Sequence, residues 1–263
     1  MQETLKQSLS ERLKQKYIHP YSFTLKGIFK ESWRLTKGAK GPLLLALFLY
    51  FLIAFGVDLL KTLVVMFSNT VVGIILQFIL EILLLKPLLG GVLLLSVQRA
   101  AGATIKGMSM FSALNWFNIL HLFVVFLWQM FLYIIVAIPL AGILLMTHTL
   151  SLTGEFNGNM LVLVSVITVA VIAVLYITTI YFMATPLIVT QRISGWQALT
   201  LSRLAVRQHF FQILWLDLVA FLILLVGGVF TLGIGFIWIF PWLYITQGRL
   251  FNTLFSLPQE THT

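Results

Sequence analysis

Residues 70–97 read TVVGIILQFILEILLLKPLLGGVLLLSV, and in this stretch only Glu81 and Lys86 carry a charge. As a helix the stretch would be about 40 Å long, which exceeds the roughly 30 Å hydrocarbon core of a bilayer. Backbone groups in lipid must be hydrogen-bonded within the segment or in a closed barrel. The alternation of polar and apolar residues that a barrel strand needs is missing. The stretch therefore predicts a membrane-spanning helix.

Six apolar runs of this kind are distributed along the chain. Only 10% of the 263 residues are charged, whereas a soluble domain carries about 25% to cover its surface. Most runs reach the roughly 17–25 residues that a span needs, and the last is short unless it continues to Phe255. The runs are Leu43 to Leu60, Thr70 to Val97, Ile119 to Leu145, Met160 to Val189, Phe210 to Val229 and Leu232 to Ile245.

The basic residues alternate between the connections of these runs. They are concentrated before the first run, in the second and fourth connections, and after the sixth run, whereas the first connection contains only Lys61 and the third and fifth contain none. This positive-inside pattern predicts six spans with both termini in the cytoplasm. It also assigns the +9 net charge to the membrane surface, so we expect no nucleic-acid partner. The expected regions are a basic cytoplasmic N-terminal segment (1–26), a six-span membrane domain (27–255) and a short cytoplasmic tail (256–263).

A recurring order of residues predicts three copies of one structural unit. Prolines lie near the ends of the second and fourth spans and within the sixth, at Pro87, Pro186 and Pro241, and each is followed by a glutamine and an arginine. We interpret each copy as a cytoplasmic interfacial helix followed by a transmembrane hairpin. The alternative is chance similarity between very apolar segments. The predicted fold is all-α and transmembrane, a six-helix bundle of three hairpins, each preceded by an amphipathic interfacial helix.

The three interfacial helices are expected at Gly27 to Gly38, Gly107 to Asn118 and Gly195 to Gln208. Each contains one tryptophan, and basic residues lie on or near each of them, a combination typical of helices at the headgroup level. Met1 to Pro20 reads either as a further amphipathic helix or as a solvated tail. The predicted interfacial anchors are Trp33, Trp116, Trp196, Arg34, Arg99, Arg192, Arg203, Arg207 and Arg249.

Local motifs resemble a broad bacterial superfamily of six-span inner-membrane proteins. They are Ser32-Trp33-Arg34-Leu35 before the first span, and Pro186-Leu187-Ile188-Val189 with Gly195-Trp196-Gln197-Ala198-Leu199 before the fifth. Related segments form the membrane domain of some glycerophosphodiester phosphodiesterases. The resemblance implies a bacterial inner-membrane location. It implies no phosphodiesterase activity, because these residues contain no soluble hydrolase domain, and it transfers no functional residue.

Four polar residues within the spans form the candidate intramembrane cluster: Gln77, Glu81, Lys86 and Asp217. At about 1.5 Å per residue, Glu81 lies near the midplane, and Lys86 and Asp217 share a level nearer the cytoplasm. We expect Lys86 to face Asp217 or to join both acids, because unpaired charges at that depth are costly. Glu81 and Lys86 are five residues apart, which makes a pair on one regular helix unfavourable.

This cluster has three possible roles. It can fix how the second and fifth spans pack, or Glu81 can bind a proton or cation in a polar crevice. Lys86 can also extend to the interface without a partner. Gln77 lies one turn before Glu81 and could share a hydrogen bond with it.

The sequence contains no pattern that favours an enzyme. There is no cysteine, which excludes disulfides, thiolate metal sites and a cysteine nucleophile. The motifs of zinc peptidases, P-loop proteins and serine hydrolases are also missing. We therefore expect no catalytic residue, metal or cofactor. The leading hypothesis is a non-enzymatic protein that organises the membrane or assists partners, with anionic lipids, a membrane protein or a second copy as partner. The alternative is a small-solute or proton-coupled transporter that uses Glu81, Lys86 and Asp217.

Overall fold

The computed structural model describes residues 24–151 and 156–255, and these residues form helices joined by short turns. The expectations for Met1 to Pro20 and for the tail 256–263 lie outside the described residues. The elements are α2 (Leu25–Thr36), α3 (Lys40–Phe67), α4 (Thr70–Leu80), the π-helix η1 (Glu81–Leu85), α5 (Lys86–Ala100), the 3-10 helix η2 (Gly107–Ala113), α6 (Trp116–Ser151), α7 (Phe156–Tyr181), α8 (Ala184–Gln191), α9 (Gly195–Gln208), α10 (Phe210–Phe230) and α11 (Phe236–Leu254).

Five helical segments of the described chain are long and apolar enough to cross a membrane, which supports an all-α, multi-pass membrane protein. The sixth predicted run differs from the others, because residues 231–235 form a turn and α11 begins only at Phe236. The second half of α11 carries Arg249 and packs into the protein core. The five segments are Lys40–Phe67, Thr70–Ala100, Trp116–Ile143, Val164–Gln191 and Phe210–Phe230.

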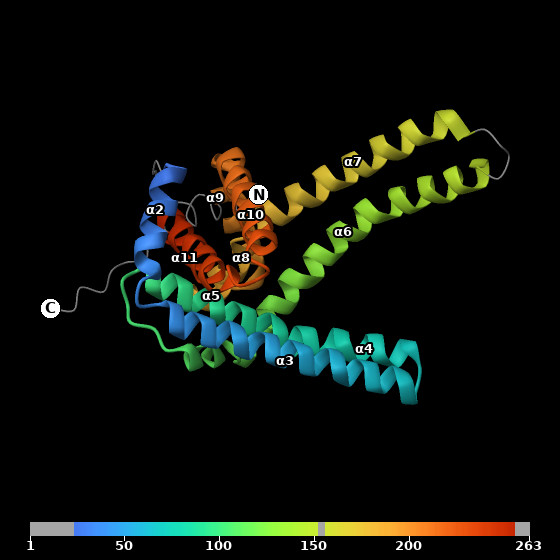
Figure 1. The fold of residues 1–263 in the computed structure, drawn as a ribbon. Helices are drawn as coiled ribbons and strands as arrows, with labels where there is room; N and C mark the ends of the chain where they lie inside the picture. Colours follow the sequence, from blue (N-terminus) through green and yellow to red (C-terminus); the bar gives the residue numbers. More distant parts are fainter. Residues whose placement is uncertain (1–23, 152–155, 256–263) are drawn as a thin grey trace, which may run out of the picture.

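The long helices form hairpins that diverge from a common region. Figure 1 shows α3 beside α4 and α6 beside α7 as two separate arms, which leave the region where α2, α5, α8, α9 and α11 gather. Large apolar side chains on the arms are exposed, including Phe55, Ile138 and Val169. Most of the long apolar helices therefore have sides without a partner among the described residues.

The buried core lies where the shorter helices meet. One cluster joins α8, α9 and α11 through fully buried side chains such as Leu187, Leu201 and Phe251. A second cluster joins α3, α5 and η2 around Leu43 and Leu88. The three prolines of the repeated unit are all buried within α5, α8 and α11. The recurring prolines therefore lie in the buried part of the protein, whereas Gln98 and Arg192 of the same pattern are exposed.

Two of these prolines follow an irregular turn of helix. A proline has no N–H for the carbonyl four residues earlier, and its ring collides with that carbonyl. For Pro87 the carbonyl belongs to Leu83, in the middle of η1. For Pro186 it belongs to Phe182, in the turn between α7 and α8. The helix changes geometry at the position that the proline disturbs.

The break between α7 and α8 exposes backbone carbonyls that need new partners. The hydroxyl of Ser202, buried on α9, donates a hydrogen bond of 2.6 Å to the carbonyl of Ile180 near the end of α7. A carbonyl without a hydrogen-bond partner in a water-free environment destabilises the fold by roughly several kcal/mol. Ser202 therefore stabilises the break and fixes α9 against it.

The three predicted interfacial helices differ in how well they agree with the structure. For the third, the helix and its bounds are confirmed as α9, and Ser194 and Gln197 form a capping box at its start. The first is shifted by two residues, to Leu25–Thr36. The second is wrong as an amphipathic α-helix, because only the 3-10 helix Gly107–Ala113 forms and α6 already begins at Trp116. Its sequence, GMSMFSA, contains glycine and serines, which favour a regular α-helix poorly.

Helices α5 and α11 cross at unusually close range. The backbone of Ser96 and Val97 in α5 lies against Gly248 in α11, so that a Cβ atom at position 248 would lie 2.8 Å from the Val97 nitrogen. Small residues allow membrane helices to approach in this way. Asn252 donates a side-chain hydrogen bond of 3.1 Å to the Val97 carbonyl at the same crossing.

We expect Gly248→Ala to destabilise the protein, because the added methyl group collides with backbone that cannot rotate away. Overpacking of this kind typically costs about 1–3 kcal/mol, and thermal unfolding in detergent would measure it. Gly56→Ala on α3 is the matched control, since no atom lies within 4 Å of its added Cβ. Equal unfolding temperatures for the two variants would contradict the close crossing.

Candidate functional site

The π-helix η1 lies within the second apolar segment, Thr70–Ala100, and contains Glu81. The N–H of Lys86 donates to the carbonyl of Glu81, five residues earlier, which is the hydrogen bond that defines a π turn. Such turns inside α-helices are frequent at functional sites. The sequence gives a physical reason for this one, because Pro87 disturbs the regular bond to Leu83.

The π turn brings Glu81 and Lys86 together as an ion pair. The Lys86 Nζ lies 3.4 Å from Glu81 Oε1. In an α-helix, residues five apart point about 140° away from each other, whereas the wider π turn places them near the same face. The expectation that this pair would be unfavourable is therefore wrong, and the local helix geometry is the reason.

Neighbouring aromatic rings complete the surroundings of the pair. The Lys86 Nζ lies 5.2 Å from the centroid of the Phe126 ring on α6, within the range of a cation–π interaction. Phe126 in turn packs edge-on against Phe78 of α4 at 5.4 Å. The Glu81 and Lys86 side chains are 36% and 38% exposed. The pair therefore lies at the junction of α4, α5 and α6 but is not enclosed by it.

Asp217 lies at a separate location. It lines a groove of about 200 Å³ between α10 and α11, together with Thr246 and Gln247. In the described part of the chain, Lys86 pairs with Glu81 and no ion pair joins it to Asp217. The expected Lys86–Asp217 contact is therefore not formed, because α10 packs mainly against α11.

Gln77 does not extend the cluster either. No hydrogen bond among the described residues links its amide to Glu81, and only the backbone of Glu81 bonds back to the Gln77 carbonyl. The candidate cluster thus divides into a Glu81–Lys86 pair and an isolated Asp217.

Two of the predicted interfacial anchors instead bind α2. Arg249 on α11 places Nη2 2.8 Å from both carboxylate oxygens of Glu31. Arg99, at the end of α5, donates to the carbonyls of Leu35 and Lys37 at 3.1 and 2.8 Å. Those carbonyls lie at the negative end of the α2 dipole, where a cation is favoured. Nothing in the sequence indicates Glu31 as the partner of Arg249, since 218 positions separate them.

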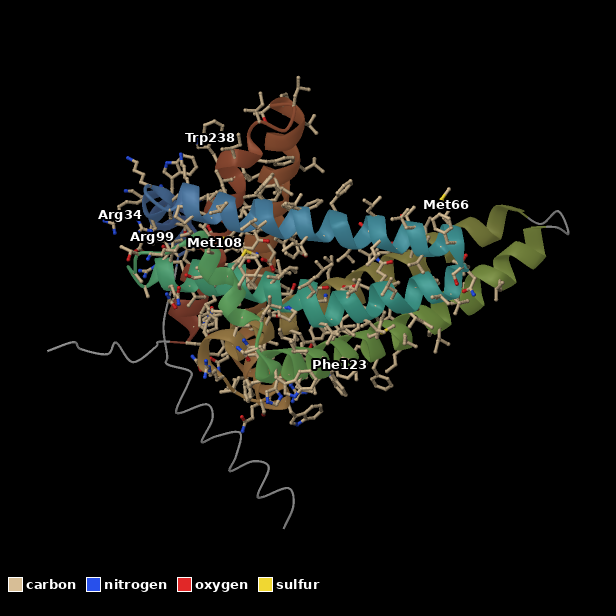
Figure 2. All side chains as sticks on the ribbon, turned by 90° about the horizontal axis from the view of Figure 1, so that it is seen from below. Arg34, Met66, Arg99, Met108, Phe123 and Trp238 are labelled. Carbon is tan, nitrogen blue, oxygen red and sulfur yellow. The ribbon has the colours of Figure 1, made fainter. Side chains whose placement is uncertain are left out.

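The other predicted anchors lie on the surface. Trp33, Trp116 and Trp196 are 51%, 68% and 59% exposed. Figure 2 shows Arg34 and Arg99 at one end of the α3–α4 hairpin and Met66 at the other. The basic end is the one at which the core helices gather. The remaining exposed basic residues of the set are Arg34, Arg192, Arg203 and Arg207.

The described residues offer no group of three or more His, Asp or Glu side chains that could hold a metal ion. Comparison with family models, curated proteins and solved structures finds no match for the chain.

We expect the Glu81–Lys86 pair to show energetic coupling in a double-mutant cycle. Lys86→Gln leaves a carboxylate without its partner in a poorly solvated position, so Glu81→Gln should cost less in the Lys86→Gln background than alone. Thermal unfolding in detergent micelles would measure the four proteins of the cycle. A second cycle on Lys86 and Asp217 is the control and should be additive. Additivity in the first cycle would contradict the ion pair.

Proposed function

We propose that the chain is a six-span protein of the bacterial inner membrane, arranged as three hairpins with both termini in the cytoplasm. We further propose that it acts without catalysis, by organising lipids or assisting a membrane protein partner. The observation that carries the proposal is the combination of diverging apolar hairpins with a core that presents exposed Trp and Arg side chains at its surface.

The charge distribution supports α11 as the sixth span. Its first half, from Phe236 to Ile245, is apolar and includes no charged residue. With five spans, basic segments would lie on both sides of the membrane, contrary to the positive-inside tendency. With six, the basic residues before α2, after α5, around α9 and at Arg249 share one side.

The absence of cysteine makes this topology directly testable. We expect cysteines introduced at Ser68 and Thr231, in the turns α3–α4 and α10–α11, to react with an impermeant thiol reagent added outside spheroplasts. Cysteines at Ala103 and Ser109 should react only after the membrane is opened, because they follow α5 at the basic end. Labelling of Thr231→Cys and Ala103→Cys from the same side would contradict the six-span arrangement.

Two features of the surface support the proposed role in membrane organisation. Most of the large exposed side chains described on the hairpins are apolar, so they suit contact with acyl chains or with apolar helices of a partner. At the basic end of the protein, each basic residue near an anionic lipid surface adds about 1 kcal/mol of attraction. A protein with this surface would gather anionic lipids around its core and leave its hairpins available for lateral contacts.

The alternative, transport through Glu81, Lys86 and Asp217, has less support. Lys86 already neutralises Glu81, and Asp217 lies in its own groove between α10 and α11. The described positions of these residues do not line a common path. The exposed ion pair at a π turn is the feature that keeps this alternative in consideration.

Removal of an exposed basic residue should reduce the enrichment of anionic lipid. Arg207→Gln removes an exposed charge on α9, and about 1 kcal/mol corresponds to roughly a fivefold local preference. Mass spectrometry of the lipids retained in polymer discs cut from the membrane would give the ratio of phosphatidylglycerol to zwitterionic lipid. Gln208→Ala, at the neighbouring exposed position, is the uncharged control. An unchanged ratio in Arg207→Gln would count against lipid organisation by this surface.

A further inference from the structure

A groove of about 570 Å³ lies between α2, α10 and α11, at the basic end of the protein. Its size falls in the usual range for small-molecule sites. Aromatic and aliphatic side chains form most of its wall, and two lysines join them. The lining residues are Leu25, Lys26, Phe29, Lys30, Trp33, Trp215, Val219 and Trp242.

Contacts within the protein fix the aromatic wall of the groove. Trp242 of α11 packs against Phe29 at 5.3 Å and edge-on against Trp33 at 6.0 Å. Its indole N–H donates to the Phe29 carbonyl at 3.2 Å, so its polar atom is already satisfied. Because Arg249 binds Glu31, the α2 and α11 walls of the groove are held together.

The two lysines bring positive charge to the α2 side of this apolar wall. Lys26 and Lys30 are four residues apart on α2, so they lie on one side of the helix. Both are exposed, and no described residue forms an ion pair with either of them. The nearest acid on α2, Glu31, is bound to Arg249. The lysine ammonium groups are therefore available to an anion from outside the described structure.

The opposite wall runs from the headgroup level toward the acyl chains. Trp215 and Val219 lie on one face of α10, about 8 and 14 Å from its start at Phe210 by the rise of a helix. Trp215 is 59% exposed. A tryptophan at this depth is typical of the boundary between headgroups and hydrocarbon. The groove thus joins a cationic zone to an apolar zone over the dimensions of one lipid.

We propose that this groove binds one anionic glycerophospholipid. The phosphate accepts hydrogen bonds from the ammonium groups of Lys26 and Lys30. The part of an acyl chain nearest the headgroup lies against Trp215, Val219 and Trp242. Charge complementarity selects the anionic headgroup, and the aromatic wall selects a lipid over a free phosphate. The inference rests on the proposed function, which places α2 at the level of the lipid headgroups. It adds one defined binding site to the general preference for anionic lipids.

The test is native mass spectrometry of the full chain, released from detergent and titrated with phosphatidylglycerol or phosphatidylcholine. We expect one phosphatidylglycerol to bind at least tenfold more tightly than phosphatidylcholine. Lys26→Gln/Lys30→Gln should lose that difference, and Trp215→Ala should weaken both lipids. Lys106→Gln/Arg203→Gln is the matched control, because it removes the same charge from exposed positions outside the groove.

The outcomes separate this site from the proposed function. Equal loss of phosphatidylglycerol in the two double variants overturns the site but leaves general lipid attraction by the basic surface intact. Equal binding of the two lipids to the unmodified protein overturns the site as well. Unchanged binding in Lys26→Gln/Lys30→Gln, with normal thermal unfolding, overturns it whatever the control shows. Loss confined to Lys26→Gln/Lys30→Gln supports the site even if the Arg207→Gln variant leaves lipid enrichment unchanged.

Discussion

Backbone hydrogen bonding constrains the two irregular turns of helix that precede Pro87 and Pro186. Where Pro186 interrupts the fourth span, Ser202 supplies a donor to the Ile180 carbonyl from the neighbouring helix. Where Pro87 disturbs the second, the helix keeps its bonds by widening to a π turn. Both irregular turns occur where other helices are close enough to pack around them. The core therefore lies at the levels of Pro87 and Pro186, and the α3–α4 and α6–α7 arms extend away from it.

The basic residues serve two physical roles that the sequence does not separate. Arg99 and Arg249 are spaced like the other positive-inside residues, yet they bind the end of α2 and Glu31. Arg203 and Arg207 remain exposed on α9. Arg99 and Arg249 therefore contribute to the positive-inside pattern and also hold α2 against the core. That position of α2 gives the aromatic groove its shape.

The sequence predicts the features that depend on local interactions, and it does not predict those that depend on contacts between remote residues. Periodicity and hydropathy predict the five long spans and the bounds of α9, because these depend on local composition and on the capping residues Ser194 and Gln197. The Glu81–Lys86 pair could not be predicted with regular helix geometry, although Pro87 was a signal for the irregular turn. The position of Asp217 depends on whether α10 packs against α5 or α11, which no local pattern encodes. The ion pair of Glu31 and Arg249 could not be predicted for the same reason, because its two residues lie 218 positions apart.

The crossing of α5 and α11 also bears on how the chain is assembled during synthesis. Val97 receives its hydrogen bond from a residue 155 positions later, and Glu31 receives its arginine from one 218 positions later. The helices within each arm, α3 with α4 and α6 with α7, contact each other locally, so each pair can enter the bilayer when the ribosome has completed it. The central core has to wait for the last helix. Until then, the faces of α2 and α5 that later contact α11 are uncovered, and a chain that ends before Gly248 has no residue that could fill the close crossing with α5.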